Sequence, residues 1–321
     1  MPTAYIFPGQ GAQFVGMARD LTETYDSARA IVDRASTLLG FDIDAVMYGD
    51  GLGPDEAAAR LRRTDNTQPA LFVHSMAAWS VLRERGVTPD CTAGHSLGEY
   101  SALVAAGAIS FEDGMMAVRR RGELMADANR VEAGTMLAVI GLDDDAVNAV
   151  CDRVERETDG VVRPANYNSP GQVVISGSLA AIDAAAALAT EAGARKVVPL
   201  DVGGAFHSPL MAYAAEGLSE ALNRLELRKP MCPVVLNVTA EPTTDPEMIR
   251  ALLLEQLVSP VRWTQSVVAM HEQGIDRFVE VGPGKILSGL VKRILDRNTA
   301  TEQAGTVDDL ERLYAADWPT G

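Results

Sequence analysis

A serine flanked by glycines, between a strand-like and a helix-like segment, is the feature that most limits how this chain can fold. Residues 94–98 read Gly-His-Ser-Leu-Gly, a G-x-S-x-G motif centred on Ser96. Residues 87–93 form a short apolar run and residues 97–106 are rich in Ala, Leu and Val, which predicts strand, sharp turn and helix. Such pentapeptides also occur by chance in tight turns, but this context favours Ser96 as a nucleophile.

Alternating helix-like and strand-like segments predict an α/β fold for most of the chain. Ala-rich helical stretches are separated by short β-prone runs, for example at residues 4–7, 234–238 and 277–281, which is typical of a mostly parallel sheet. After residue 298 the periodicity fades. We expect a short docked helix or a loose tail there.

One segment departs from this alternation. Its expected elements follow the order strand, helix, strand, strand, helix, strand, at residues 134–141, 143–157, 161–168, 172–177, 179–192 and 194–200. This βαββαβ order is the ferredoxin-like signature, so we predict an inserted α+β subdomain at residues 132–203. The larger domain is then discontinuous, built from residues 1–131 and 204–321.

Composition and charge narrow the classes of partner and of site. The 321 residues carry a formal net charge of −16 at pH 7, which argues against binding to nucleic acid or to an anionic membrane surface. No apolar run is long enough to cross a bilayer and no charged-then-apolar leader follows Met1, so we expect a cytoplasmic protein. Cys91, Cys151 and Cys232 lack metal-ligand spacing and are odd in number, which indicates buried free thiols without a metal site.

A nucleophilic serine needs a base, and the chain contains four histidines. His95 adjoins Ser96 and should point away from it across a sharp turn, while His271 lies in a polar helical stretch. His74 lies in an apolar helical run, where a buried structural histidine is the more common explanation. His207 follows two glycines on a loop at a domain junction, where catalytic side chains often lie. We therefore predict His207 as the general base.

An arginine triplet predicts how the substrate is recognised. If the helix after Ser96 leads away from it for about ten residues and the next helix runs back for about ten, the chain returns to the level of Ser96 near residue 121. Of the arginines at 119–121, only Arg121 falls within the apolar arc of its helix. Because a buried charge is costly unless paired, Arg121 meets either an internal carboxylate or a substrate anion. A guanidinium matches a carboxylate in two parallel hydrogen bonds, so the second alternative predicts an acyl group with a free carboxylate.

No acidic residue is an obvious third member of a triad. Asp201 is nearest to His207 in sequence and is expected at a strand end. A thioester has a good leaving group, so a Ser–His pair oriented by a backbone carbonyl can suffice. The residues therefore favour thioester chemistry.

Seven motifs, in order along nearly the whole chain, carry a resemblance to a known family. They are FPGQGAQ at 7–13, GHSLGEY at 94–100, RG at 121–122, NYNSPGQ at 166–172, AFHSP at 205–209, PVRWT at 260–264 and EVGPGK at 280–285. With these motifs the chain closely resembles malonyl-CoA:acyl-carrier-protein transacylases and, more broadly, the acyltransferase domains of fatty acid and polyketide synthases. The resemblance implies a hydrolase-like α/β core with a mostly parallel sheet and a ferredoxin-like insert.

The resemblance also implies roles for individual residues. Ser96 would be acylated, His207 would be its base and Arg121 would hold the malonyl carboxylate. The backbone N–H groups of Gln10 and Leu97 would form the oxyanion hole, which fits a Gly-Gln-Gly loop beside the serine turn. The main-chain carbonyl of Gln256 would orient His207, which fits the missing acid.

Two further residues follow from the resemblance. Asn166 would line the substrate site, although an asparagine before Ser-Pro-Gly also has a structural reason to be there. A Phe before the catalytic histidine accompanies malonyl specificity in polyketide acyltransferases, so Phe206 favours malonyl. Many relatives have Ser-Ala where this chain has Gly203-Gly204, which removes no catalytic group.

The expected reaction is a ping-pong transfer of malonyl from malonyl-CoA to the phosphopantetheine thiol of an acyl carrier protein, supplying fatty acid synthesis. It needs no metal or redox cofactor, and we expect a monomer that releases coenzyme A. A stand-alone acyltransferase of a polyketide pathway would use the same residues. A serine esterase or thioesterase would pass the acyl group to water, and a carrier-binding subunit would have no activity.

Overall fold

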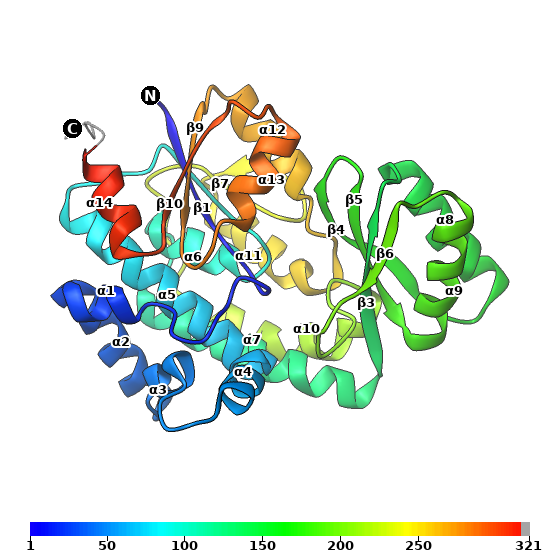
Figure 1. Cartoon of the computed structure of the whole chain (residues 1–321), viewed down its shortest axis with the longest axis horizontal. Helices are drawn as coiled ribbons and strands as arrows, with labels where there is room; N and C mark the ends of the chain where they lie inside the picture. The colour runs from blue at the N-terminus through cyan, green and yellow to red at the C-terminus, as the bar shows by residue number, and fades with distance from the viewer. Residues whose placement is uncertain (316–321) are drawn as a thin grey trace.

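The computed structural model describes residues 1–315 and contains two β-sheets with helices packed against both (Figure 1). The larger sheet is mostly parallel and the smaller one is antiparallel. The predicted fold class, an α/β core with a ferredoxin-like insert, is confirmed. No helix within residues 1–315 is long and apolar enough to cross a membrane.

The larger sheet has the strand order β10-β9-β1-β2-β7-β8, with β8 alone antiparallel to its neighbour. Its strands are β1 (Thr3–Phe7), β2 (Cys91–Gly94), β7 (Val234–Val235), β8 (Pro242–Thr243), β9 (Arg277–Val281) and β10 (Ala300–Ala304). Successive side chains of β1 enter two different cores: Tyr5 and Phe7 face one, and Ala4 and Ile6 face the other. A parallel strand covered on both faces in this way reads as a continuous apolar run.

Helices cover both faces of this sheet (Figure 1). They are α1 (Arg19–Thr24), α2 (Asp26–Leu39), α3 (Ile43–Tyr48), α4 (Pro54–Arg62), α5 (Thr64–Glu84), α6 (Gly98–Ala105), α7 (Phe111–Val131), α10 (Ala212–Arg224), α11 (Pro246–Glu255), α12 (Trp263–Glu272), α13 (Ile286–Ile294) and α14 (Val307–Ala315), with the 3₁₀ turns η1 (Pro209–Met211) and η2 (Gln256–Val258). Helices α12 and α13 pack on the Ala4 side, whereas α2, α5 and α7 pack on the Tyr5 side.

The second sheet forms the inserted subdomain and has the strand order β4-β5-β3-β6. Its elements are β3 (Gly134–Ile140), α8 (Asp144–Glu157), β4 (Val162–Ser169), β5 (Gln172–Ser178), α9 (Leu179–Glu191) and β6 (Lys196–Pro199). Every neighbouring pair is antiparallel, as the ferredoxin-like order requires. The boundaries at 131/132 and 203/204 stay a prediction.

The two faces of the inserted sheet have different partners. Leu137 and Val139 of β3 pack with α8 and α9, whereas Met136 and Ala138 belong to the main core. Strand β4 is also tied to the larger domain by backbone hydrogen bonds, because Val261 donates to Ala165 O at 2.8 Å and accepts from Tyr167 N at 2.9 Å. The insert is therefore fixed against the domain that carries Ser96.

The C-terminal region differs from expectation in one respect. The expected docked helix is present as α14, but β10 precedes it and adds an edge strand parallel to β9. Three of its five residues, Thr301, Glu302 and Gln303, are polar and half-buried. An edge strand has one neighbour only and needs no apolar run, which is why the periodicity fades there.

Close backbone packing fixes the turn around Ser96. A Cβ added to Gly98 would lie 2.0 Å from the carbonyl oxygen of Phe7, and one added to Gly94 would lie 1.9 Å from the carbonyl carbon of Gly98. Ser96 itself has a φ of 52°, in the left-handed region that non-glycine residues rarely adopt. The two glycines are therefore required because strand, turn and helix touch at the backbone.

Gly98→Ala is expected to lower the free energy of unfolding by about 3 kcal/mol or more, because the added methyl group meets backbone that cannot move aside. Gly289→Ala is the matched control, since a Cβ there meets nothing within 4 Å inside α13. That change should raise the free energy of unfolding by about 0.5–1 kcal/mol. Urea unfolding measures both, and equal effects would contradict this explanation of the turn.

Candidate active site

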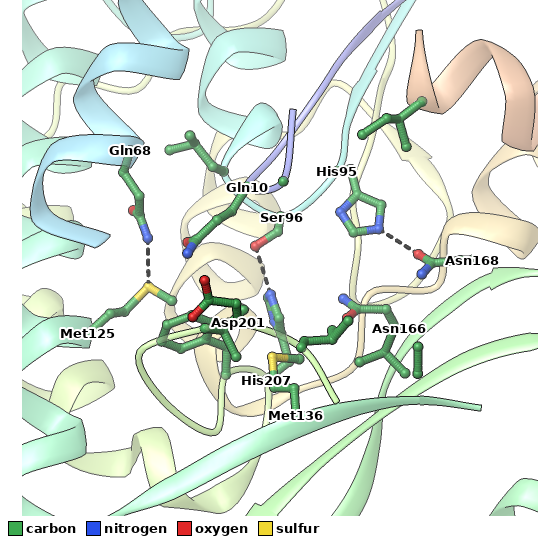
Figure 2. A pocket seen from close by; sticks show the side chains of 18 of the residues that line it. Gln10, Gln68, His95, Ser96, Met125, Met136, Asn166, Asn168, Asp201 and His207 are labelled. Atoms are coloured by element: carbon green, nitrogen blue, oxygen red, sulfur yellow. Dashed lines mark hydrogen bonds between the residues drawn. The ribbon is translucent and has the colours of Figure 1, made fainter. Parts of the chain in front are cut away.

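Ser96 and His207 face each other across the junction of the two sheets. Ser96 lies in the turn between β2 and α6, and His207 lies on the loop that precedes η1. The Ser96 Oγ and His207 Nε2 atoms are 2.7 Å apart, and a dashed line marks this hydrogen bond in Figure 2. His207 also has a left-handed backbone, with a φ of 58°. Strained backbone of this kind persists only where its surroundings hold it, and it clusters at functional sites.

Backbone carbonyls orient the His207 ring. Its Nδ1 lies 3.0 Å from the carbonyl oxygen of Gln256 and 3.2 Å from that of Ser259. Because carbonyl oxygens only accept hydrogen bonds, Nδ1 carries the proton and Nε2 is left as an acceptor for the Ser96 hydroxyl. Asp201 lines the same cavity, but it makes no hydrogen bond to His207 within residues 1–315. A carbonyl therefore takes the place of a triad acid.

The environment keeps His207 neutral. Burial and the nearby Arg121 cation lower the pKa of His207 from 6.5 to about 3, although the hydrogen bonds to Gln256 and Ser259 partly oppose this. Both effects disfavour a second positive charge. At neutral pH the ring is therefore unprotonated at Nε2, the atom that faces the Ser96 hydroxyl.

Arg121 lies beside the same serine hydroxyl. It projects inward from α7 and is only 1% exposed. Its Nη2 donates to Ser96 Oγ at 3.0 Å and to Gln256 Oε1 at 3.0 Å, and its Nη1 donates to Gln68 Oε1 at 2.9 Å. Within residues 1–315 its Nε has no acceptor and no carboxylate lies within ion-pair distance, although the buried Glu99 carboxyl interacts with it electrostatically. Of the two alternatives for a buried arginine, this geometry favours a substrate anion.

A cavity of about 390 Å³ opens in front of Ser96 (Figure 2). Its wall combines side chains of the larger domain with strands β3, β4 and β5 of the insert. Polar residues of the lining include Gln10, Gln68, Ser96, Arg121, Asn166, Asn168 and His207, and apolar ones include Leu97, Met125, Met136, Val174 and Phe206. An apolar cavity with a few convergent polar groups is typical of a substrate site.

The remaining residues expected at the site lie around this cavity. Gln10 and Leu97 line it, and neither backbone N–H donates a hydrogen bond to an acceptor in residues 1–315. Asn166 and Phe206 are buried and also line it. Gln256 lies behind His207 and is outside the lining. All eight predicted site residues therefore gather at one place.

The other histidines have structural surroundings. His95 points away from Ser96, and its Nε2 lies 2.8 Å from Asn168 Oδ1 (Figure 2). His74 is fully buried in α5, where its Nε2 lies 2.8 Å from the carbonyl oxygen of Gly305. Burial lowers the pKa of His74 to about 4. Both agree with the exclusion of these residues as the base.

Sequence reasoning missed three residues that contact the site. Gln68 binds Arg121 through its Oε1 and lies 3.0 Å from Met125 Sδ through its Nε2. Asn237 and Glu99 are buried and connect to the Ser96 backbone. Isolated amides and a glutamate at a helix start carry no local pattern that distinguishes them from surface residues, so only the tertiary fold identifies them.

No group of three or more His, Cys, Asp or Glu side chains that could hold a metal ion occurs among residues 1–315. The free thiols Cys91, Cys151 and Cys232 are all buried, as expected.

Comparison with known proteins places this site in a family. The Acyl transferase domain profile matches residues 4–313. The chain belongs to the acyl transferase domain family. A Staphylococcus aureus (strain COL) protein named malonyl CoA-acyl carrier protein transacylase is 46% identical to this acyl transferase over 309 residues, covering 96% of this chain and 97% of the relative.

Solved structures of the family have the same fold. An acyl carrier protein S-malonyltransferase from Vibrio cholerae has a TM-score of 0.91 and 42% identity, covering 98% of this chain and 100% of the other. A malonyl-transacylase solved in complex with a type II polyketide synthase acyl carrier protein has a TM-score of 0.90 and 40% identity, covering 97% and 98% of the two chains. These likenesses extend over both sheets of this acyl transferase.

Arg121→Gln is expected to raise the pKa of His207, because the substitution removes a buried cation beside the ring. Burial remains, so the pKa should stay below the ordinary value of 6.5. An NMR titration of ring-labelled histidines measures the shift, with His207→Gln to assign the signal. Arg120→Gln on the same helix is the control, and an unchanged or lowered pKa in Arg121→Gln would contradict the electrostatic account.

Proposed function

We propose that this acyl transferase moves a malonyl group from malonyl-CoA to the phosphopantetheine thiol of an acyl carrier protein, supplying fatty acid synthesis. The observation that carries the proposal is Arg121, a buried guanidinium 3.0 Å from Ser96 Oγ that forms no ion pair with a carboxylate in residues 1–315. The malonyl-specific names of relatives that match over nearly the whole chain support the same substrate.

The first half-reaction forms a malonyl-serine ester. Ser96 Oγ attacks the thioester carbonyl while His207 Nε2 accepts the hydroxyl proton. The N–H groups of Gln10 and Leu97 stabilise the negative oxygen of the tetrahedral intermediate. As the intermediate collapses, the carbon–sulfur bond breaks and the coenzyme A sulfur takes the proton from His207.

The second half-reaction reverses these steps with a new thiol. The phosphopantetheine thiol of the carrier protein gives its proton to His207 and attacks the ester carbonyl. The carbon–oxygen bond to Ser96 then breaks, and Ser96 Oγ recovers the proton from His207. Every bond formed has a counterpart that breaks, so no metal or redox cofactor enters the proposal.

Arg121 supplies the specificity. Its Nη2 donates to Ser96 Oγ and Gln256 Oε1, and its Nε has no acceptor within residues 1–315. A malonyl carboxylate can accept from this guanidinium in a charge-assisted pair, which an acetyl group cannot do. Asn166 and Phe206 line the same cavity, and the resemblance to polyketide acyltransferases associates a Phe at position 206 with malonyl.

Two features favour transfer to a thiol over hydrolysis. The His207 ring is held by carbonyl oxygens in place of an acid, and the leaving group of a thioester needs less help than that of an amide. The carboxylate site at Arg121 has no purpose in a general esterase. A carrier-binding subunit without activity would not need the 2.7 Å contact between Ser96 and His207.

A polyketide carrier protein is the second candidate acceptor. One structural relative was solved with a type II polyketide synthase carrier protein, at 40% identity. The proposed chemistry at Ser96 is identical for both acceptors.

A single chain supplies all eight site residues, so we further propose that the enzyme works as a monomer. We also propose that it acts in the cytoplasm.

Arg121→Ala is expected to lower kcat/KM for malonyl transfer to a holo acyl carrier protein by about 10²–10³-fold, because a buried charge-assisted pair is lost. Acetyl transfer should change much less, so the malonyl-to-acetyl preference collapses. Steady-state assays with both thioesters measure the ratio. Arg120→Ala, an exposed neighbour on α7, should keep the ratio, and a preserved ratio in Arg121→Ala would contradict the assigned role.

A further inference from the structure

Asn237 makes hydrogen bonds to both sides of the serine turn. It follows β7 and is 1% exposed. Its side-chain Oδ1 accepts from the Ser96 backbone N–H at 2.7 Å, and its Nδ2 donates to the Gly94 carbonyl oxygen at 2.6 Å. The residue is absent from the cavity lining, so it cannot contact the acyl group directly.

The backbone of Asn237 is fixed as well. Its N–H donates to Glu99 Oε2 at 2.7 Å, and its carbonyl oxygen accepts from the Arg262 N–H at 3.0 Å. Glu99 is fully buried and lies three residues after Ser96, on the helix that the serine turn begins. The turn, the start of α6 and the segment after β7 therefore form one closed hydrogen-bonded network.

We propose that Asn237 is a positioning residue that holds Ser96 in its strained conformation and aligns its Oγ for both half-reactions. This inference rests on the proposed function of Ser96. The amide is suited to the task because it accepts from one side of the turn and donates to the other. An ionised carboxylate at this place would lack the donor, and a hydroxyl would have to make both contacts through a single atom.

Backbone strain is the reason that the two side-chain hydrogen bonds from Asn237, called the clamp below, are needed. A non-glycine residue at a φ of 52° stays there only when its surroundings hold it. Released from the clamp, Ser96 can relax and move its Oγ away from His207 Nε2, and small displacements of a reacting atom have large effects on rate. The clamp also occupies the Ser96 N–H, which leaves the N–H groups of Leu97 and Gln10 to face a negative oxygen.

The first test removes the clamp with Asn237→Ala. Rapid-quench measurements should show acylation by malonyl-CoA and transfer to the carrier thiol falling by a similar factor, about 10–100-fold, because Ser96 Oγ takes part in both steps. The malonyl-to-acetyl ratio should stay at the wild-type value, since Arg121 is untouched. Asn298→Ala, on an exposed loop, is the control for a general effect of losing an amide.

The second test uses Asn237→Asp, which keeps the shape of the side chain. One carboxylate oxygen can accept from the Ser96 N–H, but the other faces the Gly94 carbonyl oxygen and repels it. Protonation of that oxygen restores a donor. Burial and the neighbouring Glu99 carboxyl raise the pKa of the introduced group, whereas Arg121 and Arg262 oppose this. His207 also titrates beside Ser96, which its Nε2 contacts, but this ring is present in the wild type as well.

The activity of Asn237→Asp relative to the wild type should therefore rise by about tenfold or more between about pH 8 and about pH 5.5. Dividing by the wild-type rate at each pH corrects for the titration that the wild type itself shows, and in Asn237→Asp the introduced carboxyl and Glu99 titrate as a coupled pair. Asn237→Ala should show no such rise. Thermal unfolding at each pH confirms that every variant compared is folded, and if Asn237→Ala does not fold the Asn237→Asp ratio decides alone.

Three results would overturn the inference: wild-type acylation in folded Asn237→Ala, a changed malonyl-to-acetyl ratio, or a pH-independent defect in Asn237→Asp. A different result would show that the proposed function itself is wrong. In that case the wild-type protein itself would form no malonyl-serine ester, whatever the behaviour of the Asn237 variants.

Discussion

Arg121 places a positive charge in the interior of the protein, 3.0 Å from the hydroxyl of Ser96. Neutral oxygens of Gln68, Ser96 and Gln256 accept from its Nη1 and Nη2, whereas within residues 1–315 its Nε has no acceptor and no carboxylate forms an ion pair with it. A buried cation in this state attracts an anion and disfavours protonation of the neighbouring His207. Substrate choice and the proton affinity of the base thus depend on the same charge.

The architecture around this charge explains why two sheets are needed. The larger sheet and α6 position Ser96, while α7 brings Arg121 to the same level. The inserted sheet closes the cavity with β3, β4 and β5, and hydrogen bonds from Val261 hold it in place.

Much of this arrangement could be predicted from the sequence. The strand-turn-helix context of Ser96, the βαββαβ order of the insert and the inward position of Arg121 all follow from local patterns with a clear period. The elimination of three histidines also needed no structure. His207 stood out because a loop after two glycines differs from the helical surroundings of His74 and His271.

The rest depended on contacts between distant parts of the chain. The oxyanion-hole and His207-orienting roles of Gln10, Leu97 and Gln256 came only from resemblance, because backbone N–H and C=O groups leave no mark on composition. Asn237 and Gln68 lie 141 and 28 residues from Ser96 in sequence, and a single amide carries no periodic signal. Strand β10 was missed because an edge strand needs no apolar run.

The most direct test of this account is intact-mass spectrometry of the protein after brief exposure to malonyl-CoA or acetyl-CoA, followed by peptide mapping. The account predicts a malonyl adduct on Ser96 that persists until a holo acyl carrier protein removes it, with little or no acetyl adduct and none in Ser96→Ala. Equal loading of both acyl groups, hydrolysis of both thioesters, or an adduct on another residue would contradict it.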